Sequence, residues 1–232
     1  MKQVKRKDNR KNDELRKIEA KVGIIKRADG SAMFKIGDTI AIASVYGPRQ
    51  LFPAFQQNSE KGILRCIYDL MSFSVSERKK PGPSRRSTEI SMVTENALLP
   101  VLDLTKFPST VVDVFIDIIQ ADAGTRCAGI CAASMALADA GIPMKDLVTA
   151  VSVGKLGKTL VLDIDKDEED YAEGATDIPV AVLPRSGKIS LLQLDGNITK
   201  EELKEALDLA KKGCDELYKI QVKTLKEKYT AK

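Results

Sequence analysis

The sequence predicts an α+β or α/β protein made of two βα lobes with mixed sheets and packed helices. Three observations predict this class. Segments with strand periodicity alternate with helical segments, in the order strands–helix–strand–helix and then strands–helix. Hydrophobic residues make up 43% of the 232 residues, enough for a sizeable core. No obvious flexible linker separates the halves, so we expect one compact unit with lobes at 1–147 and 148–232.

The first lobe is predicted to begin with strands that follow a basic segment. Residues 1–14 carry six cations, and we interpret them as a solvated, extended tail. Turn residues then separate three strand-like segments, and a fourth follows a mixed loop. These four segments are 22–25, 31–36, 39–46 and 63–71.

A basic loop, two helices and one strand complete the first lobe. Residues 78–86 hold five cations and two prolines, which predicts an irregular basic loop. A helix is expected over 87–100, and the alternation over 110–120 predicts a strand with one buried face. The central part of 123–140 is small, apolar and uncharged. It therefore predicts a buried helix that packs closely on a sheet.

The second lobe is predicted to contain two hairpins and a long final helix. Gly-containing turns join the strands of each hairpin, and a capping box starts the helix. The segments are strands 148–153, 159–164, 178–183 and 188–194, an acidic loop over 165–176 and a helix from 199 to about 228.

The chain contains no histidine and no tryptophan. The missing histidine excludes a His-based triad, a His-ligated zinc site and an imidazole base, so acid–base chemistry falls to Asp, Glu, Lys, Cys or Tyr. The four cysteines form no CxxC pair, which favours a reduced, intracellular protein over a thiolate metal site. No apolar segment approaches the roughly 18 residues of a membrane helix, and no secretory signal is expected.

Two generic ligand motifs are incomplete. Residues 152–159 resemble a phosphate-binding P-loop, but Ser152 replaces the first glycine and a strand follows where a helix is required. Residues 163–168 begin like a calcium loop, but Glu168 replaces the glycine at the sixth position. We interpret both as ordinary turns or strands.

Three segments carry candidate chemistry, each with a plainer alternative. Residues 124–126 (Gly-Thr-Arg) could bring free N–H groups, a hydroxyl and a guanidinium onto one anion, or could be a simple helix cap. Arg85 and Arg86 could bind phosphodiester oxygens or form a solvated loop. The carboxylates of 168–177 could supply a proton donor or hold Mg²⁺, or be solvated. Together the three would form a phosphoryl-transfer site.

Longer motifs resemble one family. Residues 69–87 end in Pro-Gly-Pro-Ser-Arg-Arg-Ser, residues 120–129 read Gln-Ala-Asp-Ala-Gly-Thr-Arg-Cys-Ala-Gly, and residues 137–144 read Leu-Ala-Asp-Ala-Gly-Ile-Pro-Met. Over residues 8–229 the chain resembles the RNase PH family and, within it, the catalytic RNase PH-like subunit of the archaeal exosome. The resemblance implies an RNase PH-like fold and a phosphate-dependent 3′→5′ exoribonuclease. Inorganic phosphate would attack the terminal phosphodiester of RNA and release a nucleoside diphosphate, and the reverse reaction would add a tail.

The resemblance also implies a phosphate cradle, an RNA-binding set and a pair of catalytic carboxylates. The phosphate cradle consists of Gly124, Thr125 and Arg126. The RNA-binding set consists of Arg85, Arg86 and Tyr68. The carboxylates are Asp170, which would protonate the leaving 3′ oxygen, and Asp177, which would support it or bind Mg²⁺.

The implied partners are those of a cytoplasmic ring. They are RNA, an inactive paralogous subunit that completes a hexamer of three heterodimers, and RNA-binding cap subunits; no membrane is involved. Because this chain keeps the acid and the phosphate cradle, it resembles the active subunit. Two alternatives stay open: a catalytically silent ring subunit that binds RNA, and a small-molecule phosphotransferase, which would need a nucleotide loop that the sequence lacks.

Several positions depart from the family pattern. Asn9 replaces glycine in the N-terminal Asp-Gly-Arg motif, a mild change because Asn tolerates left-handed backbone. Residues 53–55 and Ile67 are uncharged where basic residues are expected along the RNA path. The interval from Asp170 to Asp177 is one residue longer than expected. These departures bear on RNA threading and on the geometry of the two carboxylates.

Overall fold

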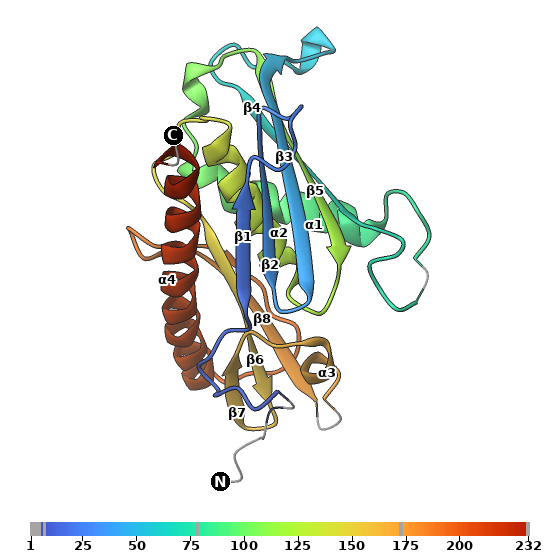
Figure 1. Ribbon diagram of the computed structural model, residues 1–232, viewed down its shortest axis with the longest axis vertical. Helices are drawn as coiled ribbons and strands as arrows, with labels where there is room; N and C mark the ends of the chain where they lie inside the picture. Colours follow the sequence, from blue (N-terminus) through green and yellow to red (C-terminus); the bar gives the residue numbers. More distant parts are fainter. Residues whose placement is uncertain (1–5, 7, 78, 172–173, 231–232) are drawn as a thin grey trace.

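Two sheets, four α-helices and three short 3₁₀ helices make up the part of the chain that the structure describes (Figure 1). This computed structural model describes residues 6, 8–77, 79–171 and 174–230. The strands are β1 (Ile18–Val22), β2 (Gly30–Ile36), β3 (Thr39–Gln50), β4 (Ile63–Leu70), β5 (Thr110–Gln120), β6 (Thr149–Leu156), β7 (Thr159–Leu162), β8 (Ala175–Leu183) and β9 (Lys188–Leu192). The helices are η1 (Ala54–Gln56), α1 (Arg85–Leu98), η2 (Leu99–Val101), η3 (Leu104–Lys106), α2 (Thr125–Asp139), α3 (Lys166–Glu169) and α4 (Lys200–Thr230).

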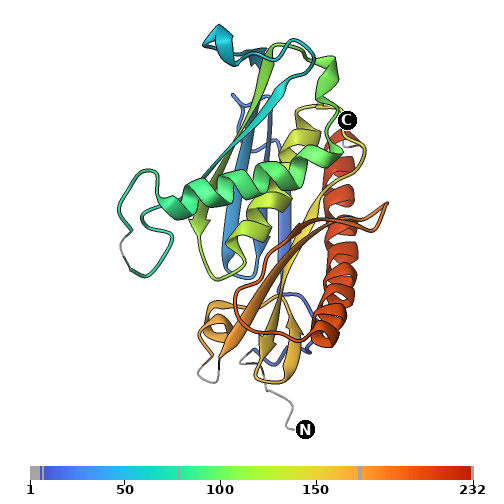
Figure 2. The same cartoon turned by 180° about the vertical axis from the view of Figure 1, so that it is seen from behind.

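The first sheet has the strand order β1-β2-β3-β5-β4. The predicted three-stranded antiparallel meander is confirmed, since β1, β2 and β3 pair antiparallel in succession; β4 alone is parallel to its neighbour, β5. The predicted first strand, 22–25, is wrong in position, because β1 ends at Val22 and Gly23 has φ 70°. In β5 the predicted alternation holds, with Val112, Val114, Ile116 and Ile118 all fully buried. These side chains lie on the face that α2 covers, and α1 packs beside α2 on the neighbouring strand β4 (Figure 2).

Helix α2 packs against both sheets, which explains its small apolar residues. It contacts β2 and β3 of the first sheet and β6 of the second. The hydroxyl of Ser134 accepts a hydrogen bond from the Val148 N–H at 2.8 Å, and residues of both lobes form one continuous buried core. The N-terminal end of α2 consequently lies where the two lobes meet.

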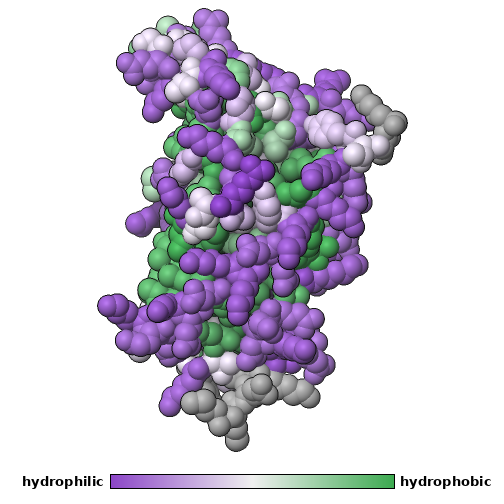
Figure 3. Space-filling model, turned by 90° about the vertical axis from the view of Figure 1, so that its left-hand side faces the viewer, coloured by the Kyte–Doolittle hydropathy of each residue, from purple (hydrophilic) through white to green (hydrophobic). Residues whose placement is uncertain are grey.

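The second sheet has the order β7-β6-β8-β9, with every pair antiparallel. Helix α4 packs on β6, β7 and β8 and also reaches β1 (Figure 1). Its apolar stripe is buried, while the surface on this side of the molecule is mostly hydrophilic with some apolar areas (Figure 3). Among the described helices, none combines the length and the apolar character that crossing a membrane requires.

The expectation of a solvated N-terminal tail is wrong for the arginines that the structure describes. Arg6 is 3% exposed and the Arg10 side chain 9% exposed, because both lie against acidic groups of the second lobe. Asn9, next to them, has φ 61°, the left-handed backbone anticipated for the position of the missing glycine. The expected tail residues Lys2, Lys5 and Lys7 lie outside the described residues.

Two predicted loops are partly helical. Helix α1 begins at Arg85 rather than Ser87, because the Ser84 side chain caps the N–H of Ser87 at 3.0 Å; Arg85 and Arg86 thus form the first helical turn. Arg78, in the same predicted basic loop, lies outside the described residues. The predicted acidic loop contains α3, which Asp165 caps in the same way. Capping by a single serine or aspartate moved both boundaries.

Replacement of Gly30 by alanine is expected to lower the free energy of unfolding by about 1–3 kcal/mol. A Cβ at Gly30 would lie 2.7 Å from the Cα of Ala140, and closer still to the backbone of Ala136 and Ala140. These are backbone atoms at the end of α2, so no side-chain rotation relieves the clash. Urea denaturation measures the change, and an unaltered midpoint would contradict the predicted close packing.

Candidate active site

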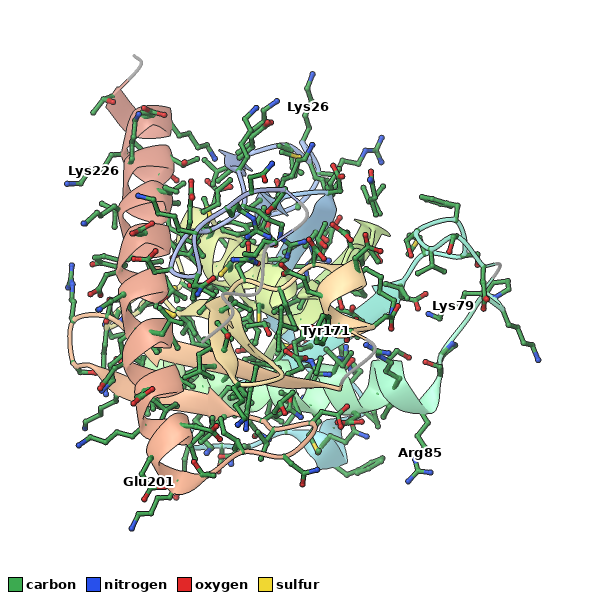
Figure 4. The ribbon with its side chains drawn as sticks, turned by 90° about the horizontal axis from the view of Figure 1, so that it is seen from below. Lys26, Lys79, Arg85, Tyr171, Glu201 and Lys226 are labelled. Atoms are coloured by element: carbon green, nitrogen blue, oxygen red, sulfur yellow. The ribbon has the colours of Figure 1, made fainter. Side chains whose placement is uncertain are left out.

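A cavity of about 640 Å³ lies between the N-terminal end of α2, the beginning of α1 and the α3–β8 region. It gathers seven of the eight predicted site residues: Tyr68, Arg86, Gly124, Thr125, Arg126, Asp170 and Asp177. The eighth, Arg85, instead lines an adjoining cavity of about 580 Å³, and its side chain extends from the beginning of α1 away from the body of the protein (Figure 4). Arg86, Arg126 and Asp177 border both cavities, so the two are continuous parts of one site.

The residues predicted to form the phosphate cradle follow a turn with left-handed backbone. Ala123 and Gly124 have φ of 55° and 63°, and α2 begins directly afterwards without a side-chain cap. Thr39 secures the turn, because its hydroxyl donates to the Ala123 carbonyl at 2.6 Å and accepts from the Asp122 N–H at 2.9 Å. The first N–H groups of a 15-residue helix therefore open towards the cavity, as an anion requires.

Arg126 projects from the first turn of α2 and is partly buried. One of its terminal nitrogens donates to the side-chain oxygen of Gln193, beyond the end of β9. This contact holds the guanidinium beside the helix end, where its charge adds to the helix dipole.

Tyr68 lies on β4 and is 4% exposed. Burial raises the pKa of its phenol, and a hydrogen bond with the Thr125 side chain partly offsets this effect. Tyr68 thus touches the cradle from the wall of the cavity while the rest of the ring packs in the core.

The two predicted carboxylates differ in environment. Asp177, on β8, is partly buried, and this burial raises its carboxyl pKa; the hydroxyl of Ser152 and the charge of Arg126 oppose that rise. The Asp170 side chain is 63% exposed and forms an ion pair with Lys166 at 2.8 Å. The lengthened interval between them includes residues 172 and 173, which lie outside the described residues. Both carboxylates line the cavity, and Asp177 is the less exposed of the two.

Sequence reasoning missed several supporting residues of the site. Ser152 donates to Asp177, Gln193 accepts from Arg126, and Lys79 reaches the Asp69 carboxylate at 3.0 Å from the basic loop (Figure 4). In the sequence, Ser152 stands out only as the residue that replaces the first glycine of a P-loop. Its contact depends on the antiparallel pairing of β6 with β8, so no local motif signals it.

The donor set suits one particular kind of Mg²⁺ site. Within the described residues, no three His, Cys, Asp or Glu side chains cluster as metal ligands. Mg²⁺ is commonly held by one or two carboxylates together with substrate phosphates and water. The carboxylates that line this cavity fit that arrangement when phosphate oxygens supply the remaining ligands.

Comparison with known proteins identifies the family. Residues 14–143 match the model of the 3′ exoribonuclease family, domain 1 (RNase PH), and residues 146–213 match domain 2 of the same family. The chain belongs to the RNase PH family. The predicted family and the predicted 3′ exoribonuclease activity are confirmed.

Curated relatives of this RNase PH family member are similar over nearly their whole length. The exosome complex component Rrp41 of Thermococcus kodakarensis is 55% identical over 97% of this chain and 90% of that protein. The component of the same name from Pyrococcus furiosus is 55% identical over 97% and 89%, and that from Methanopyrus kandleri is 50% identical over 96% and 92%.

Solved structures confirm the predicted RNase PH-like fold. Rice Rrp46 superposes with a TM-score of 0.85 at 24% identity, covering 95% of this chain and 100% of that one. The Archaeoglobus fulgidus exosome with RNA bound to the active site superposes with a TM-score of 0.79 at 22% identity, covering 92% and 91%.

Proposed function

We propose that the chain is the catalytic subunit of an exosome ring, a phosphorolytic 3′→5′ exoribonuclease that releases nucleoside diphosphates from RNA. One observation carries this proposal: an uncapped helix end with Arg126 and a partly buried carboxyl group, Asp177, line one cavity. The similarity to exosome Rrp41 components supports the same activity. The reaction needs an anion site, cations for the RNA backbone and a proton donor, and none of these roles needs histidine.

The cationic groups of the site bind two different reactants, inorganic phosphate and the RNA end. The N–H groups at the start of α2, the Thr125 hydroxyl and Arg126 hold inorganic phosphate, since a helix end and a guanidinium reinforce each other there. Arg86 borders both cavities, and Arg85 lines the outer one, so these two hold the phosphates of the RNA end. Tyr68 contacts the terminal nucleotide from the cavity wall.

Asp177 supplies the proton. A phosphate oxygen attacks the terminal phosphorus, the bond from phosphorus to the 3′ oxygen breaks, and that oxygen takes the proton of the Asp177 carboxyl group. Burial favours the protonated acid, and the Ser152 hydroxyl orients it. The proposal therefore exchanges the roles that the resemblance implied for the two carboxylates, and the exposed, Lys166-paired state of Asp170 supports this exchange.

Within this proposal, Mg²⁺ binds at Asp170 rather than at Asp177. The Asp170 side chain is exposed at the cavity, whereas Asp177 already accepts a hydrogen bond from the Ser152 hydroxyl. Asp170 and the substrate phosphates would hold the ion, which would neutralise part of the phosphate charge.

The proposed location is the cytoplasm. The proposed partners are the inactive paralogue of a hexameric ring and RNA-binding caps, and the proposed lobes are 1–147 and 148–232.

The test is phosphate dependence. A 5′-labelled oligoadenylate is incubated with the chain assembled with its paralogous partner, with and without inorganic phosphate. We expect a ladder of shortened RNA together with ADP only when phosphate is present. Release of AMP without phosphate would contradict phosphorolysis, and tight RNA binding without shortening would favour a silent ring subunit. Consumption of ATP without RNA would favour a small-molecule phosphotransferase.

A further inference from the structure

Arg6 precedes the strands of the first lobe in sequence but lies against the second lobe. Its Nε and Nη2 atoms donate to the two carboxylate oxygens of Glu168, at 2.7 and 2.8 Å. The same guanidinium donates to the carbonyl oxygens of Leu162 and Asp163, at 2.9 and 2.7 Å. Because Glu168 belongs to α3, Arg6 attaches the N-terminal segment to the helix that precedes Asp170.

Arg16 bridges the two lobes. Its Nε and Nη2 atoms donate to the two carboxylate oxygens of Asp163 in the second lobe, at 3.0 and 2.8 Å. Its Nη1 atom donates to the carbonyl oxygen of Asp122, at 2.5 Å, and to its carboxylate, at 3.2 Å. Asp122 stands two residues before Gly124 of the phosphate cradle, and its carboxylate also accepts from the Lys166 N–H at the start of α3.

Asp163 joins these contacts to the proton donor. It is 2% exposed and has φ 55°, a backbone conformation that residues other than glycine rarely adopt. Its N–H donates to the Ser152 carbonyl at 2.8 Å, and its own carbonyl accepts from Arg10 at 3.0 Å. Ser152 is also the residue whose hydroxyl donates to Asp177. A continuous path of bonds therefore leads from the buried arginines to the catalytic carboxyl group.

The path connects the phosphate cradle and the catalytic carboxylates, which the reaction requires at a fixed distance from each other. The phosphate cradle belongs to the first lobe, whereas Asp177 and α3 belong to the second. A displacement of about 1 Å between a bound nucleophile and its proton donor costs about 10²-fold in rate. Buried bidentate ion pairs suit this role, because a low dielectric strengthens them and their geometry has few alternatives.

We propose that Arg6, through Glu168 and Asp163, and Arg16, through Asp163 and Asp122, are positioning residues that fix the phosphate cradle relative to the catalytic carboxylates. This inference rests on the proposed function. It assigns different consequences to the two contacts. Arg16 supports the turn that binds phosphate, so its loss weakens phosphate binding. Arg6 supports α3, so its loss slows the chemical step.

The test uses lysine replacements, which keep the charge but lose the bidentate geometry. In the chain assembled with its partner, Arg16→Lys is expected to raise the KM for phosphate about tenfold with a smaller change in kcat. Arg6→Lys is expected to lower kcat about tenfold and leave that KM unchanged. Asp122→Asn, which keeps the turn's shape, is expected to have the same effect as Arg16→Lys. It provides the test in the event that Arg16→Lys does not fold.

Lys228→Met is the matched control. Lys228 pairs with the buried Asp139 at the opposite end of α2, far along the helix from the cradle. Its loss is expected to lower Tm without changing either kinetic constant. Wild-type constants in Arg16→Lys and Arg6→Lys, or a fall in Tm alone, would overturn the positioning role. That outcome, with phosphorolysis intact in the wild type, differs from failure of the proposed function, in which the wild type releases no ADP.

Discussion

Replacement of Asp177 by asparagine is expected to slow phosphorolysis by about 10³-fold while leaving RNA binding intact. Asparagine keeps the shape of the side chain and its contact with Ser152, but it has no acidic proton for the leaving 3′ oxygen. The pKa of Asp177 is raised because the carboxyl group is buried, which favours the form that donates. Release of ADP in a single turnover measures the loss, and fluorescence anisotropy with labelled oligoadenylate measures binding.

Asp170→Asn is the matched control for that variant. Asp170 is exposed and paired with Lys166, so its replacement should cost about tenfold and should raise the Mg²⁺ concentration needed for activity. Activity of Asp177→Asn equal to the wild type, with an inactive Asp170→Asn, would assign the role of proton donor to Asp170.

In the wild type, kcat should fall as pH rises through the raised pKa of Asp177, because deprotonation removes the donor. Asp177→Asn should lack that limb.

Local patterns predicted most of the secondary structure. The alternation of β5 and the small apolar residues of α2 each reflect a single, continuous environment, one buried face or burial on all sides. The N-terminal segment was misjudged, because clustered cations normally remain solvated. Arg6 is buried only because Glu168 meets it from 162 positions away, and no local pattern carries that information.

The same distinction separates the features of the candidate site that local sequence predicts from those that depend on distant residues. The position of Gly124, Thr125 and Arg126 at the start of the buried helix could be predicted, since Gly124 precedes the helix with left-handed backbone and Arg126 follows within one turn. The different environments of Asp170 and Asp177 could not, because they depend on tertiary packing: the Asp170 side chain is exposed, whereas burial raises the carboxyl pKa of Asp177. Ser152 was equally hidden: it reaches Asp177 only after β6 and β8 pair. Residues that bind through their own turn leave a motif, whereas residues that orient others across a sheet do not.

Replacement of Arg126 by alanine is expected to raise the KM for phosphate about 10²-fold, because a charged donor beside the helix end is lost. The helix N–H groups and Thr125 remain, so high phosphate should restore part of the rate. Initial rates of ADP release over a range of phosphate concentrations measure the effect.

Arg85→Ala is the control. Because Arg85 lines the outer cavity, its replacement should weaken RNA binding without changing the KM for phosphate. Unchanged phosphate dependence in Arg126→Ala would remove Arg126 from the cradle. A rise in KM for both reactants would instead place Arg126 between phosphate and RNA, as its position on the border of the two cavities also permits.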